Sequence, residues 1–467
     1  MARQHRILIW VFFIFAMSLR LWLYWTNPPI NAFDNHFEPI YWIMKFGTIP
    51  PKDVLWQSYH PPVFYVISAM VGELAMKAGI AIRQIPKVLQ FISCFYGILT
   101  IGIVYLILKK VPLSDFSRLL AFGFACFLPR HIYMSAMHSN DTIAGLSVAV
   151  SLFLMLVALE RRFSYPVTVM SSIAITIALF TKYTSFVVIP MALSILSPVL
   201  LQRILIPRKR LIVACLLLVV VPLLCLSAYC YSNFKNYDNP LPVNTDYRNP
   251  GANQPRAENG LSFTDFKPWK SIKTPILAPW NIDSFWTLIY SNMWFDMSPK
   301  FLYYTDLNVS WWKSYTQWLK GERGFPSSIA LSPFTYFTGS ALITMGLVPL
   351  LFIILGVYRS IFGKLGQRNE MDGEIAIKSQ IFLVSFLFNA AGIIYMASKA
   401  PVYSVIKATY FMGSLPAFSV FLGLGIMVCE KRRLFRWIIA FVFGCLFSLV
   451  VLHIAHIAYS LGFRLGI

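Results

Sequence analysis

Charged residues are scarce in this 467-residue sequence. Asp, Glu, Lys and Arg make up 13% of it, whereas 57% of the residues are hydrophobic. A soluble globular chain has about 25% charged residues, so this chain has too little charge to cover a water-facing surface. The scarcity excludes a soluble globular protein and predicts an integral membrane protein.

Acidic residues are scarcer than basic ones, with 19 Asp and Glu against 40 Lys and Arg and a net charge of +21. Such a balance would suggest a nucleic-acid partner if the cations were clustered on one surface. Here they lie between apolar runs, as in the inner loops of a polytopic membrane protein. The charge therefore indicates orientation in the membrane, and we expect no nucleic-acid partner.

Cysteine is also sparse and carries no motif. The seven cysteines lie in or at the ends of apolar segments and show no CxxC or Cys/His spacing. We predict that they are small core residues, with no zinc site or disulfide framework among them.

Apolar runs define the predicted fold. A helix needs roughly 17 to 25 apolar residues to cross a hydrocarbon core of about 30 Å. Eleven runs qualify: 7–26, 88–108, 118–136, 142–160, 166–181, 184–201, 211–231, 337–358, 379–397, 410–429 and 437–459. A twelfth, 61–79, contains Pro61, Pro62, Glu73 and Lys77, which suit the interface better than the bilayer centre.

Basic residues decide whether 61–79 crosses. The candidate inner loops hold Lys109, Lys110, Arg118, Arg161, Arg162, Arg203, Arg208, Lys209, Arg210, Arg359, Lys364, Arg368, Lys378, Lys431, Arg432, Arg433 and Arg436. Together with Arg3 and Arg6 they face the cytoplasm only if 61–79 stays on the outer side. We predict an all-α polytopic protein with about eleven transmembrane helices, an uncleaved first helix and outer-face juxtamembrane helices.

This topology divides the chain into three parts. They are an N-terminal transmembrane core, 1–231, with its first outer loop at 27–87; a large outer loop, 232–336; and C-terminal transmembrane helices, 337–467. The large loop is rich in Pro, Asn and aromatic residues, and we expect short helices near 281–295 and 308–320.

The first outer loop places candidate catalytic groups close together in sequence: Asp34, His36, Glu38 and, further on, His60. Asp34 and Glu38 would share one face if the stretch were helical. Asp34 could then act as a general base that His36 or Glu38 orients. Alternatively, Asp34 caps a helix over 35–46.

A second cluster runs from Pro129-Arg130-His131 to His138-Ser139-Asn140-Asp141 at the outer start of the fourth span. Asp141 is either the N-cap of that span or a functional acid on the same side as Asp34. Two such acids with histidines beside them could share a divalent metal ion or, through one, a diphosphate-like group.

A third cluster, Lys399 to Pro416, leads into the tenth span. Lys407 and Tyr410 are one helical turn apart and could both face an anionic head group. The alternative is a lysine that extends to the membrane interface.

Together these clusters resemble the GT-C superfamily of membrane glycosyltransferases. The likeness is greatest to bacterial relatives of the dolichyl-phosphate-mannose protein mannosyltransferases and to the lipid A aminoarabinose transferases. It rests on Asp34 soon after the first helix, His60-Pro61-Pro62, Asn140-Asp141, and Lys407 with Tyr410 and Pro416. It covers residues 1 to about 230 well, and beyond them only the stretch 399–416. At the place of Lys407, arginine is commoner in the family. At the place of His60, a lysine is frequent in the aminoarabinose branch.

The resemblance implies inverting, single-displacement transfer of a sugar from a polyprenyl-phosphate donor to an acceptor hydroxyl at the outer face. Asp34 would be the general base, while His60, Lys407 and Tyr410 would bind the donor phosphate. Asp141, with Asn140, Glu38 and His36, would position the acceptor or a metal ion. The only cofactor that the residues suggest is a divalent metal ion, with Asp34 and Asp141 as candidate ligands.

The acceptor would be a lipid, a polysaccharide or a protein, and membrane lipids would surround the enzyme. The resemblance places it in the plasma (inner) membrane of a bacterium, with its site facing the periplasm or exterior. Three alternatives are a lipid-linked glycan transporter or flippase, which predicts inverted repeats, a glycan polymerase or ligase, and a scaffold without a catalytic site.

Overall fold

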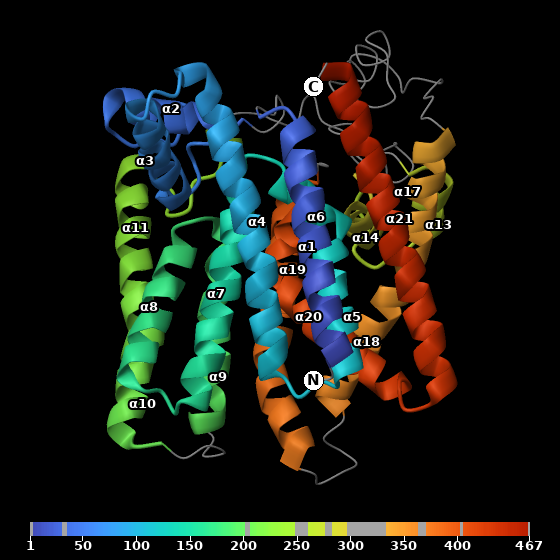
Figure 1. The fold of residues 1–467 in the computed structure, drawn as a ribbon. Helices are drawn as coiled ribbons and strands as arrows, with labels where there is room; N and C mark the ends of the chain where they lie inside the picture. Colours follow the sequence, from blue (N-terminus) through green and yellow to red (C-terminus); the bar gives the residue numbers. More distant parts are fainter. Residues whose placement is uncertain are drawn as a thin grey trace.

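A bundle of long helices makes up the computed structural model (Figure 1). The structure describes residues 3–29, 35–200, 206–247, 260–275, 283–296, 333–362, 370–401 and 405–465. In these ranges the chain forms helices and a single isolated bridge between Ser262 and Ser284. The all-α prediction is confirmed.

Each predicted span lies in helix. The elements concerned are α1 (Arg3–Thr26), α4 (Ile85–Lys110), α5 (Asp115–Phe127), α6 (Pro129–Ser135), α7 (Asn140–Glu160), α8 (Tyr165–Leu179), α9 (Val188–Leu200), α10 (Arg208–Cys215), the π-helical η3 (Leu216–Val220), α11 (Val221–Tyr237), α17 (Pro333–Met345), α18 (Leu347–Phe362), α19 (Glu370–Lys399), η8 (Ala408–Ser414), α20 (Leu415–Cys429) and α21 (Arg433–Leu465). By length and composition, nine helical stretches of the described chain can cross a membrane.

Two of the eleven predicted spans are not among these nine stretches. The third is divided at Leu128 into α5 and α6, because Pro129 has no backbone N–H and its ring opposes a continuous helix. The fifth, α8, has 15 residues and ends before Thr181.

Arg20 compensates for the break between α5 and α6. The last carbonyls of a helix have no partner inside it, and Cys126 lies in the last turn of α5. The fully buried Arg20 guanidinium donates to the Cys126 oxygen at 3.0 Å and to the Ala16 oxygen at 2.9 Å. It also lies 2.8 Å from His131 Nδ1. This charge in α1 therefore has a structural role.

The first outer loop contributes two helices, α2 (Phe37–Phe46) and α3 (Val63–Lys77), which pack together at one end of the bundle (Figure 1). The short 3-10 helix η1 (Ile82–Gln84) then leads into α4. α3 is not among the membrane-length stretches. Its place above α8 agrees with the prediction that 61–79 does not cross.

The opposite end of the bundle carries the start of α1 and the basic loops (Figure 1). Two lysines there share one acid: Lys110 Nζ lies 2.6 Å and Lys378 Nζ 3.1 Å from the Glu160 carboxylate. These contacts join α4, α7 and α19 at the predicted cytoplasmic face.

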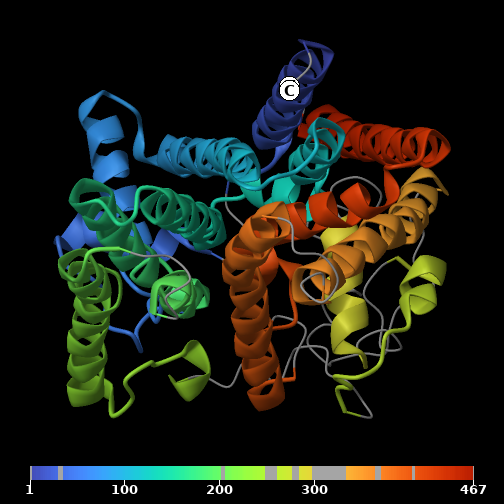
Figure 2. The same ribbon diagram turned by 90° about the horizontal axis from the view of Figure 1, so that it is seen from below.

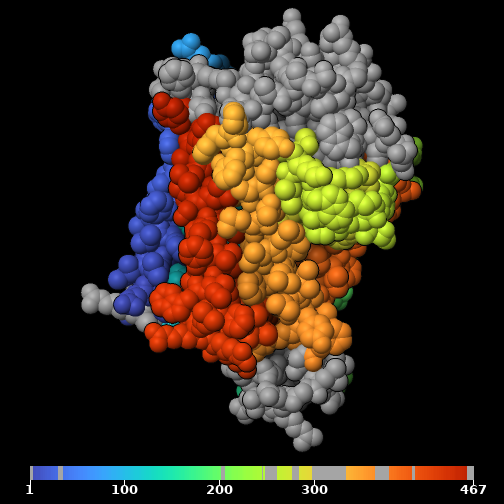
Figure 3. Space-filling model, turned by 90° about the vertical axis from the view of Figure 1, so that its right-hand side faces the viewer, coloured from blue at the N-terminus to red at the C-terminus, as the bar shows by residue number. Residues whose placement is uncertain are grey.

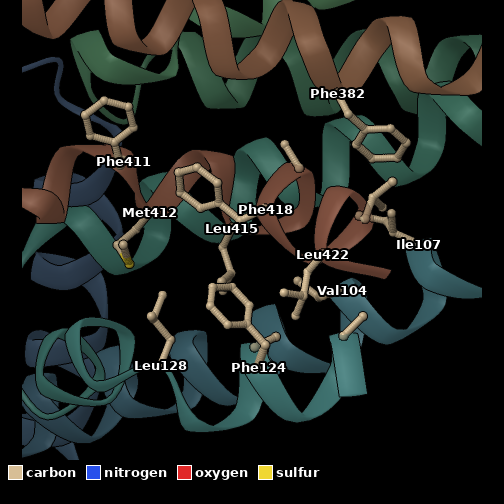
Figure 4. Packing of buried hydrophobic residues seen from close by; sticks show 14 of the residues in the cluster. Val104, Ile107, Phe124, Leu128, Phe382, Phe411, Met412, Leu415, Phe418 and Leu422 are labelled. Carbon is tan, nitrogen blue, oxygen red and sulfur yellow. The ribbon is translucent and has the colours of Figure 1, made fainter. Parts of the chain in front are cut away.

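The C-terminal half packs against the N-terminal half through η8 and α20, which lie centrally when the bundle is viewed along its axis (Figure 2). Figure 4 shows Leu415 directed toward Phe124 and Leu422 toward Val104, whereas the Phe418 ring points to the opposite side, toward Phe411. Glycine permits the closest helix contact. A Cβ at Gly425 would overlap the carbonyl oxygen of Phe352, and one at Gly356 that of Phe421. Small residues allow α18 and α20 to approach in this way.

The described parts of the large outer loop hold α12 (Asn244–Tyr247), α13 (Pro268–Lys273) and α14 (Phe285–Trp294). α13 lies against α17 (Figure 3). α14 falls within the predicted helix 281–295, whereas 308–320 lies outside the described residues. Buried Arg130 of α6 fixes α14: its guanidinium donates to the Asn292 oxygen at 2.7 Å and lies 3.3 Å from Asp296.

Candidate functional site

Three histidines gather beside α3: His36 and His60 of the first outer loop, and His138 of the turn before α7. The rings of His36 and His60 stack with centroids 6.0 Å apart, and His36 Nδ1 lies 3.0 Å from the Tyr65 hydroxyl. Phe64 contacts both His36 and His138. All three histidines are buried. Burial, with His36 nearby, lowers the pKa of His138 to about 3, so this ring is neutral at neutral pH.

Asp141 stands in the first turn of α7, but it does not cap the helix. Ser139 is the N-cap: its Oγ accepts from the Asp141 N–H at 3.2 Å. The same hydroxyl donates to Asp141 Oδ2 at 3.0 Å. The capping interpretation of Asp141 is therefore wrong, because a neighbouring serine caps the helix and leaves the carboxylate available to face inward.

Lys182 is the partner of that carboxylate. It lies between α8 and the 3-10 helix η2 (Tyr183–Val187), and its Nζ is 2.5 Å from Asp141 Oδ1 and 2.9 Å from Asn140 Oδ1. Lys182 and Asp141 are both about 6% exposed at the side chain, so water screens their attraction little. The ammonium also lies 5.1 Å from the centre of the Tyr410 ring.

Two links join the histidines to the Asp141–Lys182 pair. On one side, His138 is three residues before Asp141 in the same buried turn. On the other, the ring of Tyr183, next to Lys182, lies 6.4 Å from that of His60. The first outer loop, the start of α7, the α8–η2 turn and η8 therefore meet in one place, which we call the outer site.

Two buried polar groups of the outer site have no hydrogen-bond partner in the described part of the chain: the side-chain amide nitrogen of Asn140 and Nε2 of His138. Leaving a buried polar group without a hydrogen-bond partner destabilises a fold by about 1 to 3 kcal/mol, so native structures rarely contain such a group. A ligand that offers oxygen atoms would satisfy the Asn140 amide.

A second buried lysine, Lys52, holds the backbone of the outer site at His60. Lys52 Nζ donates to the His60 oxygen at 2.8 Å and to the Tyr229 hydroxyl of α11 at 2.9 Å. Burial lowers the pKa of Lys52 to about 8. This lysine ties the His60 backbone to α11.

The structure brings together five of the predicted site residues: His36, His60, Asn140, Asp141 and Tyr410. Lys407 is half-buried just before η8, three residues from Tyr410. Asp34 lies outside the described residues.

Glu38 differs from expectation. α2 begins at Phe37, whose N–H donates to Asn35 Oδ1 at 3.0 Å, so the helix does not extend back through Asn35 and His36 as the predicted spacing required. Glu38 is exposed and accepts from Asn35 Nδ2 at 3.3 Å. Unlike the three histidines, its side chain is not buried.

Lys182 is the site residue that the sequence interpretation missed. The available signal was its position in the two-residue gap between the predicted spans 166–181 and 184–201. A charge in an outer turn that short cannot leave the membrane surface and needs a protein partner.

The described residues do not fit a divalent metal ion as they stand. They contain no group of three potential ligands. Asp141 accepts from Lys182 on one oxygen and from Ser139 on the other. A metal site that includes Asp34 stays a prediction.

The fold matches solved membrane enzymes. The oligosaccharyltransferase of Archaeoglobus fulgidus, solved with zinc and sulfate, aligns with a TM-score of 0.50 at 15% identity over 96% of this chain and 53% of that one. Its apo form gives 0.50 at 12% identity over 98% and 56%. ArnT from Cupriavidus metallidurans gives 0.32 at 15% identity over 84% and 71%.

No family model and no curated protein sequence matches the chain. The chain spans about half the length of the oligosaccharyltransferase that it resembles. At these identities the match shows a shared fold. It supports the predicted all-α fold of a polytopic membrane protein, and the chemistry has to be argued from the outer site.

Proposed function

We propose that this protein transfers a sugar from a polyprenyl-phosphate donor to an acceptor hydroxyl in the outer site. Three features support the proposal: the fold shared with an oligosaccharyltransferase, the convergence of the predicted clusters, and the buried Asn140 side-chain amide, which has no hydrogen-bond partner among the described residues. The Asn140 amide carries most weight, because it marks a buried polar position at which a ligand would supply the missing hydrogen bond.

The reaction is a single displacement. Asp34 takes the proton of the acceptor hydroxyl as its oxygen bonds to the anomeric carbon of the sugar. The bond from that carbon to the phosphate oxygen breaks, and the polyprenyl phosphate leaves with the electron pair. The configuration inverts, and no covalent intermediate with the enzyme forms.

Cations and hydrogen-bond donors assist the leaving phosphate, on which negative charge grows in the transition state. Lys407 and Tyr410 would bind it from η8, and His60 from the first outer loop. Asn140 and Asp141 would position the acceptor. Lys182 has a different role. Since Asp141 already balances its charge, Lys182 holds α7 against η8.

The test is an in vitro assay in which the purified protein meets a panel of polyprenyl-phosphate monosaccharides and candidate acceptors. Asp34→Asn should lower turnover by about a hundred-fold to ten-thousand-fold, because the amide keeps the shape but cannot take a proton. Glu38→Gln is the matched control, since Glu38 is exposed whereas the residues of the outer site are buried or half-buried. It should stay active.

Full activity of Asp34→Asn would remove Asp34 from the reaction. Transfer from oligosaccharide donors alone would favour a glycan ligase or polymerase. Movement of the intact lipid-linked donor across vesicles without transfer would favour a flippase.

A further inference from the structure

A groove of about 830 Å³ opens on the lipid-facing side of the bundle, far from the outer site. α1 and α21 form its walls and α5 its floor; Figure 3 shows α1 and α21 side by side. Its volume is within the roughly 300 to 1,000 Å³ of small-molecule sites. Nothing in the proposed transfer uses it.

The groove is apolar along its length. Phe12 and Phe15 of α1, Phe127 of α5 and Phe447 of α21 line it. On α21, Ala440 and Gly444 keep it open, and a Cβ at Gly444 would meet no atom within 4 Å. From Arg436 to Leu452 the groove follows α21 for about 24 Å, more than the roughly 15 Å depth of one leaflet core. These dimensions suit an acyl chain.

The basic side chains of the groove lie at one end only, beside the start of α1. Arg436 and His5 lie there. Arg436 forms no ion pair among the described residues: it lies 5.8 Å from the centre of the Phe116 ring and 3.5 Å from a backbone oxygen of Glu430. His5 Nδ1 has no hydrogen-bond partner among the described residues.

The cations near this end outnumber the acids, with Arg118, Lys431, Arg432, Arg433 and Arg436 against Asp115 and Glu430. Asp115 is paired with Arg118 at 3.2 Å, and the buried Glu430 accepts from Ser117 at 2.9 Å. Arg432 and Arg433 are exposed beside Arg436 and add to the positive charge. Trp437, 66% exposed, has the amphipathic ring that is typical of the membrane interface.

We propose that the groove binds an anionic phospholipid of the leaflet that surrounds the start of α1. One acyl chain lies along Phe12, Phe15 and Phe447, and the head-group phosphate lies against Arg436 and His5. The charge at the mouth selects an anionic over a zwitterionic head group, since a cation near a membrane surface favours anionic lipid by about five-fold.

Native mass spectrometry of the full chain, released from micelles with equal amounts of dioleoyl phosphatidylglycerol and dioleoyl phosphatidylcholine, tests this proposal. We expect one phosphatidylglycerol to be retained preferentially. Arg436→Gln should weaken its retention about five-fold, and Arg436→Lys should keep most of it. Gly444→Phe should displace the lipid by filling the groove.

Two control variants separate this site from general lipid contact. Arg161→Gln removes an exposed cation from another loop at the same end. Gly102→Phe adds the same ring at a position of α4 that is equally open. Both should retain phosphatidylglycerol as the wild type does. Equal retention of the two lipids, or unchanged retention in Arg436→Gln, would overturn the proposal. If Gly444→Phe fails to fold, the comparison of Arg436→Gln with Arg436→Lys still tests the proposal.

Discussion

Asp141 and Lys182 show how a single ion pair can assemble a site. The acid comes from the start of α7 and the lysine from the turn after α8, while Tyr410 of η8 lies under the ammonium. Desolvating two charges is costly, so such a pair contributes less to stability than to fixing one arrangement, whereas removing one partner leaves a buried charge alone.

Lys182→Met should therefore destabilise the protein by about 3 to 5 kcal/mol. Lys182→Met combined with Asp141→Asn should recover much of that loss, because no unpaired charge remains. Thermal unfolding of the detergent-solubilised variants measures both. Additive losses in the double variant would show that the two side chains do not act as a pair.

Lys407 is the residue for which the alternatives differ most. If it binds the donor phosphate, Lys407→Ala should cost roughly 2 to 4 kcal/mol of transition-state stabilisation, which lowers turnover or donor affinity about ten-fold to a thousand-fold. Lys407→Arg should be nearly silent, because charge and reach are kept. An unchanged donor affinity in Lys407→Ala would favour a lysine that extends to the interface.

Sequence reasoning found His36, His60, Asn140, Asp141 and Tyr410 because each is a polar group in a predicted outer turn. It missed Lys182 because a lone lysine carries no spacing to another charge, and its partner is 41 residues away. It also kept the cap of α7 as one alternative for Asp141, since the choice between Ser139 and Asp141 depends on backbone geometry that a sequence does not show.

Among the elements, the contact of α18 with α20 shows how a membrane protein packs without a hydrophobic driving force between helices. Lipid tails are as apolar as the side chains, so close van der Waals approach supplies the attraction, and glycine permits it. Gly356 and Gly425 face the backbone of the opposite helix.

Gly425→Ala should be strongly destabilising, because the added methyl group would overlap the Phe352 carbonyl oxygen and force α18 and α20 apart. We expect a loss of about 1 to 3 kcal/mol, as for other overpacked cores. Gly392→Ala in α19 is the control, since a Cβ there meets nothing within 4 Å. Thermal unfolding that ranks Gly392→Ala as the more harmful change would contradict this packing.

Element boundaries were less predictable than element positions. Hydropathy located the helical segments at all eleven apolar runs. It could not show that the helix breaks before Pro129 in the third run or that α8 ends before Thr181. Both departures bring polar residues into the bundle: the break is stabilised by Arg20 of α1, and the early end of α8 presents Lys182 to Asp141. Such tertiary partners are invisible in a local window.

For the whole molecule, the position of α3 determines which loops share a side. Cysteines placed at Thr48 and at Lys77, both exposed, should both react with a membrane-impermeant thiol reagent from the outer side in a cysteine-free background. A cysteine at exposed Arg161 should react only after the membrane is opened. If the Thr48 position alone is labelled from outside, α3 crosses, and Asp141 is no longer on the side of the first outer loop.

The unequal charge of the two ends has an electrical consequence. The predicted inner loops carry the cations, so turning the molecule over would move many positive charges across the membrane. Each would require about 2.3 kcal/mol of work per 100 mV against an inside-negative potential, besides the cost of dehydrating the group. The resting potential therefore favours one orientation of the folded protein in the membrane, the one that keeps the basic loops on the negative side.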